Sequence, residues 1–300
     1  MDKEKTKANN NKKKFDWKAY GFVWSIIFIP VVIFIYSNVY LNIRTIEMAF
    51  TDTLGNWTFN NFKWVVEDMF SESGVMKEAL KNTLLFFFTN ITFQNFLTLF
   101  LSYFLFKRIV GYKVFRVVLY LPVIIGSVAF SIIFKSVVGA GGPIFQIVEK
   151  IHGNPIEFFA DSRYAIWAIL VYTVWVGLGG MIYQGAMARI PNDVFEAAIL
   201  DGISPLREFF QIIMPLIWPT ITTLLILSLA GLFTASGPIL LFTGGEFGTM
   251  TISYWMWDQI YTYQAYNAAA ALGLLLTMIG VPIILVSRNL LFKLQENVEY

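Results

Sequence analysis

The sequence predicts an all-α polytopic membrane protein with six transmembrane helices. Of its 300 residues, 57% are hydrophobic and only 14% are charged, whereas about a quarter of the residues of a soluble domain are charged. Apolar runs recur along the chain, each long enough for a helix to cross roughly 30 Å of hydrocarbon. Because lipid offers no hydrogen-bonding partners, each run must pair its backbone polar groups internally, and a helix does so.

The runs that we expect to be spans are 21–41, 83–106, 117–134, 164–188, 219–242 and 267–286. The first is too long for the core of a signal peptide and is expected to remain as a helix. Residues 1–18 contain seven lysines and are expected to form a disordered basic tail, which leaves 19–300 as one transmembrane domain. Prolines within four of the spans predict kinks at Pro30, Pro122, Pro238 and Pro282.

Lysine and arginine are unevenly distributed between the segments that connect the spans. If the N-terminus lies inside, the inner segments carry 15 of the 22 basic residues, and the outer segments, although longer in total, carry 7. Short cytoplasmic segments of membrane proteins are enriched in these residues. We therefore expect both termini to be cytoplasmic.

The residue types in the spans disfavour several kinds of function. None of the six predicted spans contains Asp, Glu, Lys, Arg or His, whereas proton-coupled carriers place ionisable groups at mid-membrane. Sodium coupling stays open, because carbonyls and hydroxyls can bind sodium. The chain has no phosphate-binding Gly-Lys-Ser or Gly-Lys-Thr, no cysteine and a single histidine, His152, so we expect neither ATP hydrolysis nor a metal site on it. A net charge of +2 gives no indication of a nucleic-acid partner.

The segment 189–218, between spans four and five, predicts two short helices that meet at an angle. Asn192 or Asp193 can cap the first helix, and Gly202 suits the left-handed conformation that ends it. Ser204 is a suitable N-cap for the second helix, and a proline follows it at the first helical position.

The first of these short helices has two interpretations. Val194, Ala197, Ala198 and Asp201 recur at three- and four-residue spacings and are expected to share one face, on which the alanines permit close approach of another element. Glu196 and Asp201 add negative charge for a basic partner. An amphipathic hairpin resting on the bilayer would instead carry lysines on its polar face, and this stretch has none. Their absence favours a protein partner.

Six residues of this segment stand in a fixed order: Glu196, Ala197, Ala198, Gly202, Ile212 and Pro215. The order resembles the EAA signature of permease subunits of bacterial ABC importers, with Met214 where that family usually has leucine. The stretches 190–198, 241–246 and 266–273 are similar to the carbohydrate branch of that family, of the maltose, lactose and multiple-sugar type. The resemblance covers about residues 20–295.

The resemblance implies a fold of the type I ABC importer kind in a bacterial cell membrane. The chain would pair with a second, non-identical permease, and two ATPase subunits would hold ATP and magnesium. An extracellular binding protein would deliver a sugar to the external segments 42–82 and 135–163. This chain would carry no cofactor and catalyse no reaction. Its part in coupling to the ATPase would fall to Glu196, Ala197, Ala198, Asp201, Gly202, Ile212 and Pro215.

By the same resemblance, spans four and five line the path of the sugar. The side chains there that can stack on or hydrogen-bond to a sugar include Tyr172, Thr173, Trp175, Gln184, Ser228, Thr234 and Ser236. The residues that we assign to the path are Tyr172, Trp175, Ser228, Phe233 and Thr234. The alternative is that they pack helices together, since serine and threonine are enriched at helix contacts in membranes.

Two other classes of protein stay as alternatives. A stand-alone secondary transporter is disfavoured by the uncharged spans and by the segment after span four. A membrane-embedded transferase would need clustered acids or a His/Asp constellation, whereas Asp193, Glu196 and Asp201 belong to the loop pattern. Among importers, a glycerol-phosphate permease would favour a basic residue at its site and a polyamine permease acidic ones, so a neutral sugar is favoured.

Overall fold

The computed structural model describes residues 17–71 and 74–296, so most of the predicted basic tail lies outside the described residues. Within them the regular elements are helices, together with one isolated antiparallel bridge between Thr51 and Trp57. Five helical runs of the described chain are long and apolar enough to cross a membrane, and a bent pair of helices gives up to six. The prediction of an all-α polytopic membrane protein is confirmed.

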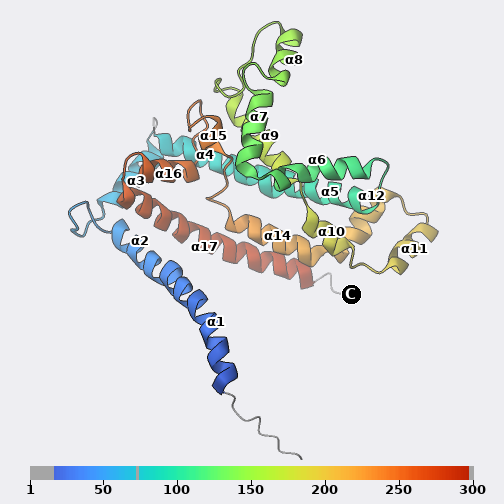
Figure 1. Ribbon diagram of the computed structural model, residues 1–300, viewed down its shortest axis with the longest axis horizontal. Coiled ribbons are helices and arrows are strands. Elements are labelled where there is room, and N and C mark those ends of the chain that lie inside the picture. Colours follow the sequence, from blue (N-terminus) through green and yellow to red (C-terminus); the bar gives the residue numbers. More distant parts are fainter. Residues whose placement is uncertain (1–16, 72–73, 297–300) are drawn as a thin grey trace, which may run out of the picture. The chain divides into compact units, whose positions relative to one another are not determined.

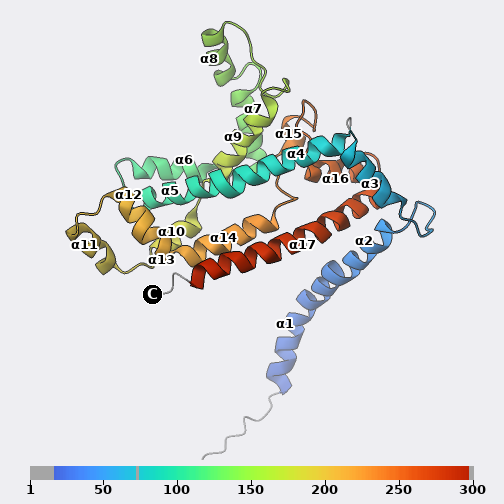
Figure 2. The same ribbon diagram turned by 180° about the vertical axis from the view of Figure 1, so that it is seen from behind.

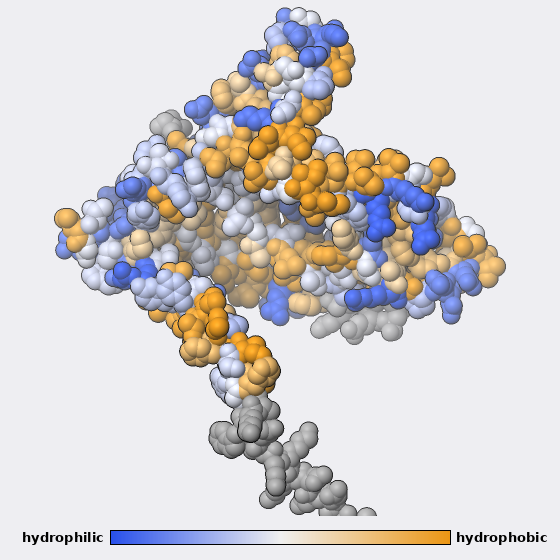
Figure 3. All heavy atoms as spheres, in the orientation of Figure 1, coloured by the Kyte–Doolittle hydropathy of each residue, from blue (hydrophilic) through white to orange (hydrophobic). Residues whose placement is uncertain are grey.

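The chain divides into two compact units, 1–48 and 49–300. The described part of the first unit is one continuous helical run, formed by α1 (Trp17–Ile35), a π-helical segment (Tyr36–Tyr40) and most of α2 (Leu41–Ala49). Its side chains from 21 to 47 are exposed, and Figure 3 shows apolar residues along it. An apolar helix with no buried face is suited to a lipid environment.

In the second unit, the second predicted span belongs to a longer run. The run consists of α4 (Val75–Phe88), a π-helical segment (Thr89–Gln94) and α5 (Asn95–Phe106). It starts well before the predicted boundary because Met76 and Ala79 are fully buried in a core with Val65 of α3 (Asn60–Phe70). This run is called span two below.

The third predicted span, 117–134, is wrong as a single helix. The structure has α6 (Tyr112–Ile125), α7 (Ser127–Val138) and α8 (Pro143–His152). The break falls at Gly126, whose φ of 89° is readily adopted only by glycine, and not at Pro122, which stays inside α6. Figure 1 shows α7 leaving the direction of α6 at this point.

The fourth and fifth predicted spans are also interrupted. The fourth consists of α9 (Ala165–Gly177) and α10 (Met181–Met187). The fifth, predicted over 219–242, is wrong as one helix: α14 (Trp218–Ala230) ends before Gly231, and the chain is non-helical up to the short α15 (Ile239–Phe242). Such irregular backbone is tolerated at membrane depth where it lies within protein or lines a cavity.

The last helices pack back onto the start of span two. α17 (Tyr266–Glu296) contacts α3, α14 and α16 (Ile252–Tyr261), and Figure 2 shows α14 and α17 running alongside each other. Asn82 Nδ2 donates to the carbonyls of Gly248 and Met250 at 2.9 and 2.8 Å, and Thr83 Oγ1 accepts from Ile252 N at 2.9 Å. These bonds attach the loop before α16 to span two.

Candidate functional site

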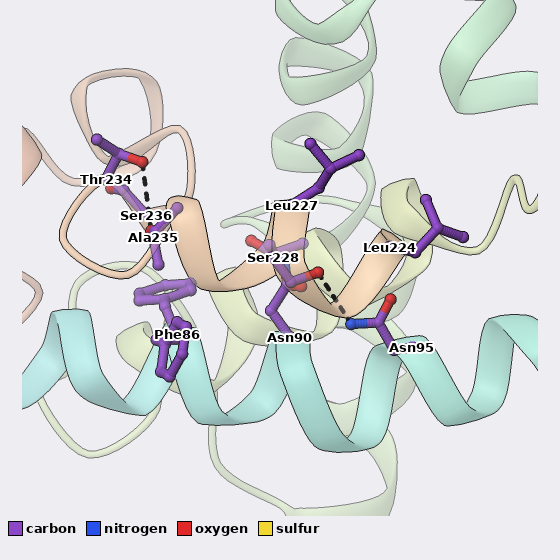
Figure 4. A pocket seen from close by; sticks show the side chains of 12 residues that line it. Phe86, Asn90, Asn95, Leu224, Leu227, Ser228, Thr234, Ala235 and Ser236 are labelled. Carbon is purple, nitrogen blue, oxygen red and sulfur yellow. Dashed lines mark hydrogen bonds between the residues drawn. The ribbon is translucent and has the colours of Figure 1, made fainter. Parts of the chain in front are cut away.

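A cavity of about 420 Å³ lies between span two, α9 and α14. Figure 4 shows it bounded by the π-helical segment on one side and by the end of α14 on the other. The residues that line it are Phe86, Phe87, Asn90, Asn95, Thr173, Leu224, Leu227, Ser228, Gly231, Thr234, Ala235 and Ser236. None of these is ionisable.

Across this cavity, the amides of Asn90 and Asn95 in span two face the hydroxyls of Thr173, Ser228 and Thr234. Asn95 Nδ2 donates to Ser228 Oγ at 3.1 Å, which joins span two to α14 (Figure 4). Thr173 Oγ1 and Thr234 Oγ1 donate to carbonyls of their own segments, at 2.8 and 3.3 Å. Each hydroxyl keeps acceptor capacity, and each amide has both donor and acceptor groups, so the lining can form hydrogen bonds with a polyhydroxylated ligand.

The π-helical segment explains how Asn90 and Asn95 reach the same cavity. Five residues make about 1.4 turns of an α-helix, so side chains at this spacing point in different directions. Here the Asn95 N–H donates to the Asn90 carbonyl, the i to i+5 bond of a π-helix, which brings the two positions back to one side. Insertions of this kind are frequent at functional sites.

The other wall is formed where α14 unwinds. Gly231 ends the helix, and the extended chain after it places Thr234 and Ser236 at the cavity. Ser236 Oγ is also 2.9 Å from Thr251 Oγ1, which precedes α16. An uninterrupted helix over 219–242 would turn these hydroxyls to different sides.

The structure brings two of the five residues assigned to the sugar path, Ser228 and Thr234, to this cavity. Tyr172 lies instead in a buried aromatic core, where its hydroxyl is 2.7 Å from Ser131 Oγ. Trp175 packs edge-on against Phe130 at 5.2 Å and lines a separate apolar groove on α9.

The last assigned residue, Phe233, packs against Gly280 of α17. Two lining residues, Asn90 and Asn95, lie on span two and were not assigned from the sequence. The available signal was the group of three amides, Asn90, Gln94 and Asn95, in a span without charged side chains, and α-helical geometry would not have placed Asn90 and Asn95 together.

The segment 189–218 forms the predicted pair of helices, α11 (Asn192–Leu200) and α12 (Pro205–Glu208). Gly202 between them has a φ of 67°, in the left-handed region predicted for it. The cap prediction for α11 is wrong, because the N-cap position is occupied by Pro191 and no side chain caps the helix. Ser204 is the N-cap of α12 by position, without a side-chain bond.

The second helix continues beyond α12 through a π-helical segment (Phe209–Ile213) and α13 (Met214–Leu216). The continuous run therefore extends from Pro205 to Leu216 and meets α14 at an angle of 75°. We call the segment 192–216 the hairpin. Ile212 is half-buried, and Pro215 lies in the first turn of α13.

The hairpin has an inner side and an outer side. Ala198 and Phe209 are buried, whereas Glu196, Ala197 and Asp201 are exposed. The predicted common face is therefore wrong in one respect, because Ala198 points inward and Ala197 outward. Ile199 and Leu200 are also exposed, at 70% and 87%. An apolar pair that remains exposed next to two carboxylates is typical of an interaction surface.

The family model for "Binding-protein-dependent transport system inner membrane component" matches residues 7–296. The chain belongs to this family. Two relatives of this permease are the lactose transport system permease protein LacF of Rhizobium radiobacter and the multiple sugar-binding transport system permease protein MsmF of Streptococcus mutans. LacF is 27% identical over 66% of this chain and 69% of its own length, and MsmF is 24% identical over 85% and 90%.

A solved structure with the same fold is that of a bacterial alginate ABC transporter in complex with an alginate pentasaccharide-bound periplasmic protein. It matches the permease with a TM-score of 0.76 at 21% identity, over 90% of this chain and 95% of the other. The likeness confirms the predicted fold of the type I ABC importer kind. The family description, an inner membrane component, and the apolar helical runs support the assignment as a multi-pass membrane component.

Proposed function

We propose that this permease forms half of the translocation path of an ATP-driven sugar importer, and that its substrate is a neutral oligosaccharide. The observation that carries the proposal is the cavity between span two, α9 and α14, which is lined by amides and hydroxyls and by no ionisable side chain. Sugar hydroxyls pair with such groups, whereas a phosphate or a polyamine would require compensating charge. The likeness to LacF and MsmF, a lactose and a multiple-sugar permease, supports a sugar substrate.

Energy would reach the permease through the hairpin. Its outer side combines exposed Ile199 and Leu200 with the carboxylates of Glu196 and Asp201, a surface suited to a cleft on an ATPase subunit that has an apolar floor and basic rim. ATP and magnesium would be bound by two such subunits. Ala197 allows the backbone to approach closely, and Gly202 sets the angle between the two hairpin helices.

The proposal also includes two further partners, because this chain would form only half of the translocation path. A second permease would form the other half of the translocation route, and an extracellular binding protein would deliver the sugar. The alginate transporter supports this delivery route, because its structure includes a periplasmic protein with a bound alginate pentasaccharide. The distribution of lysine and arginine supports cytoplasmic termini, and this orientation places the hairpin on the side where ATP is available.

The test is a reconstituted complex of this permease with its partner permease, ATPase subunits and binding protein in liposomes. We expect sugar-loaded binding protein to stimulate ATP hydrolysis and to drive accumulation of the sugar, and we expect neither in the absence of this chain. A chain that moved sugar on its own into ATP-free liposomes would be a secondary carrier, and the proposal would be wrong.

A further inference from the structure

An ion pair between a half-buried lysine and a buried carboxylate connects span two to the hairpin. Lys107, at the end of α5, places its Nζ 2.5 Å from Glu208 Oε1 of α12. The Glu208 side chain is only 7% exposed and that of Lys107 28%. The angles at this contact are not those of a hydrogen bond, so the attraction is Coulombic. Removal of Lys107 would leave the Glu208 charge buried and uncompensated.

The same lysine also contacts the other helix of the hairpin. Its Nζ lies 4.7 Å from the ring centroid of Phe195 on α11, a cation–π distance. The Phe195 ring is in turn 5.6 Å from that of Phe106. One side chain of span two therefore contacts both α11 and α12, on either side of Gly202.

Three further contacts join α5 to the second helix of the hairpin. Tyr103 donates its hydroxyl proton to the Pro205 carbonyl at 3.1 Å, at the first residue of α12. Phe209, which is fully buried, lies 5.3 Å from the Tyr103 ring and 5.5 Å from that of Phe100. Residues 100, 103 and 107 lie on one face of α5, so the hairpin is attached along two turns of the helix.

The opposite end of the same helix reaches the cavity. Asn95 starts α5 and donates to Ser228, and twelve residues of helix place it about 18 Å from Lys107. The hairpin is also linked to Ser228 through the backbone, but that route passes the 75° bend before α14. Each wall of the cavity thus has its own connection to the hairpin.

We propose that Lys107 and Glu208 are positioning residues that join the hairpin to α5 as one rigid body, so that a displacement of the hairpin reaches the Asn95 wall of the cavity through α5. The inference rests on the proposed function, because an ATPase subunit must displace the hairpin. It assigns a coupling role to span two, which lies outside the EAA segment.

The test measures sugar accumulated per ATP hydrolysed in the reconstituted complex. We expect Lys107→Met to lower this ratio about fivefold or more, the lower end of typical coupling effects, while the complex still assembles. Lys107→Arg is expected to keep the ratio, and exchange of the charges by Lys107→Glu with Glu208→Lys to restore most of it. Lys113→Met, which removes an exposed lysine of neighbouring α6, is the matched control and is expected to keep the ratio.

A covalent joint tests rigidity directly, because the chain has no cysteine of its own. Lys107→Cys combined with Glu208→Cys is expected to couple poorly until a short bifunctional thiol reagent bridges the pair, and to recover the ratio afterwards. If bridging stops transport, or if both the double variant and Lys107→Met couple like the wild type, the inference is wrong. Absence of stimulated transport in the wild-type complex would instead contradict the proposed function.

Discussion

The two ends of α5 differ in how they are packed. Around Tyr103 the helix packs against the buried Phe209 and Ile213 of the hairpin, and the lysine at its end is paired with a buried carboxylate. Around Asn95 it faces a cavity of about 420 Å³ whose polar groups keep unused hydrogen-bonding capacity. Close packing transmits displacement because it leaves little room for side-chain rearrangement, whereas a polar cavity leaves room for a ligand. The difference matches the proposed roles, with coupling at the hairpin end and sugar recognition at the cavity end.

The largest expected effect is at Gly202, where the hairpin turns. No atom lies within 4 Å of a Cβ added there, so the φ of 67° alone decides which residues fit. A β-branched residue in this conformation costs about 1–2 kcal/mol, and relief of that strain would change the hairpin angle. We expect Gly202→Val to reduce binding-protein-stimulated ATP hydrolysis about tenfold, with basal hydrolysis retained.

Gly202→Asn is the matched control for this position. Asparagine adopts the left-handed region several times more readily than most residues, so we expect it to retain most of the stimulation. Equal loss in both variants would show that the docking surface excludes any side chain at this position, and the explanation from backbone conformation would then be wrong.

The next effect concerns the cavity. Asn95→Leu keeps the number and branching of the side-chain heavy atoms and removes the donor to Ser228. One hydrogen bond contributes about 0.5–1.5 kcal/mol, so we expect the concentration of loaded binding protein needed for half-maximal uptake, or the uptake rate, to change up to about tenfold. Thr277→Val, which removes an exposed hydroxyl of α17, is the control. An unchanged uptake profile for Asn95→Leu would remove span two from the sugar path.

A third comparison separates packing from recognition among the predicted path residues. Tyr172→Phe removes the hydroxyl next to Ser131 in a buried core, and we expect a loss of about 1 kcal/mol in stability with unchanged sugar selectivity. Ser228→Ala removes the acceptor of the Asn95 bond, and we expect it to change selectivity among oligosaccharides as well as to lower stability by about 1 kcal/mol. A selectivity change in Tyr172→Phe would instead support the assignment of Tyr172 to the sugar path.

The smallest effect is expected for the ion pair between Asp161 and Arg163. This pair is more exposed than that of Lys107 and Glu208, and its removal shows how little such a pair contributes. Hydrogen bonds from Arg163 lower the pKa of Asp161 below its ordinary value of 3.8. Its stabilising contribution is therefore complete above about pH 3.8 and is lost as the pH falls through the lower folded value. We expect Asp161→Asn to change thermal unfolding only slightly at neutral pH and to flatten its dependence on pH in that acidic range. A large change at pH 7 would contradict this.

Much of the architecture could be predicted from the sequence because it depends on local properties. Apolar runs require helices in lipid, so the number of spans follows from composition. The left-handed conformation of Gly202 could be predicted because residues near it in the chain determine the turn. The positions where helices break could not be predicted in the same way. Prolines indicated kinks at 122 and 238, whereas the interruptions lie at Gly126 and Gly231.

The sequence by itself determined the class of the protein, its helical spans and the hairpin that carries the EAA order, because periodicity, composition and spacing express these properties locally. Tertiary structure alone decided which polar side chains meet. Asn95 and Ser228 are 133 residues apart and come together only because α5 packs beside α14 and a π-helical segment turns the amides inward. Lys107 and Glu208 are also far apart in the sequence and meet only because the end of α5 packs against the hairpin. Contacts between distant helices depend on packing across the whole bundle, which no single stretch of sequence records.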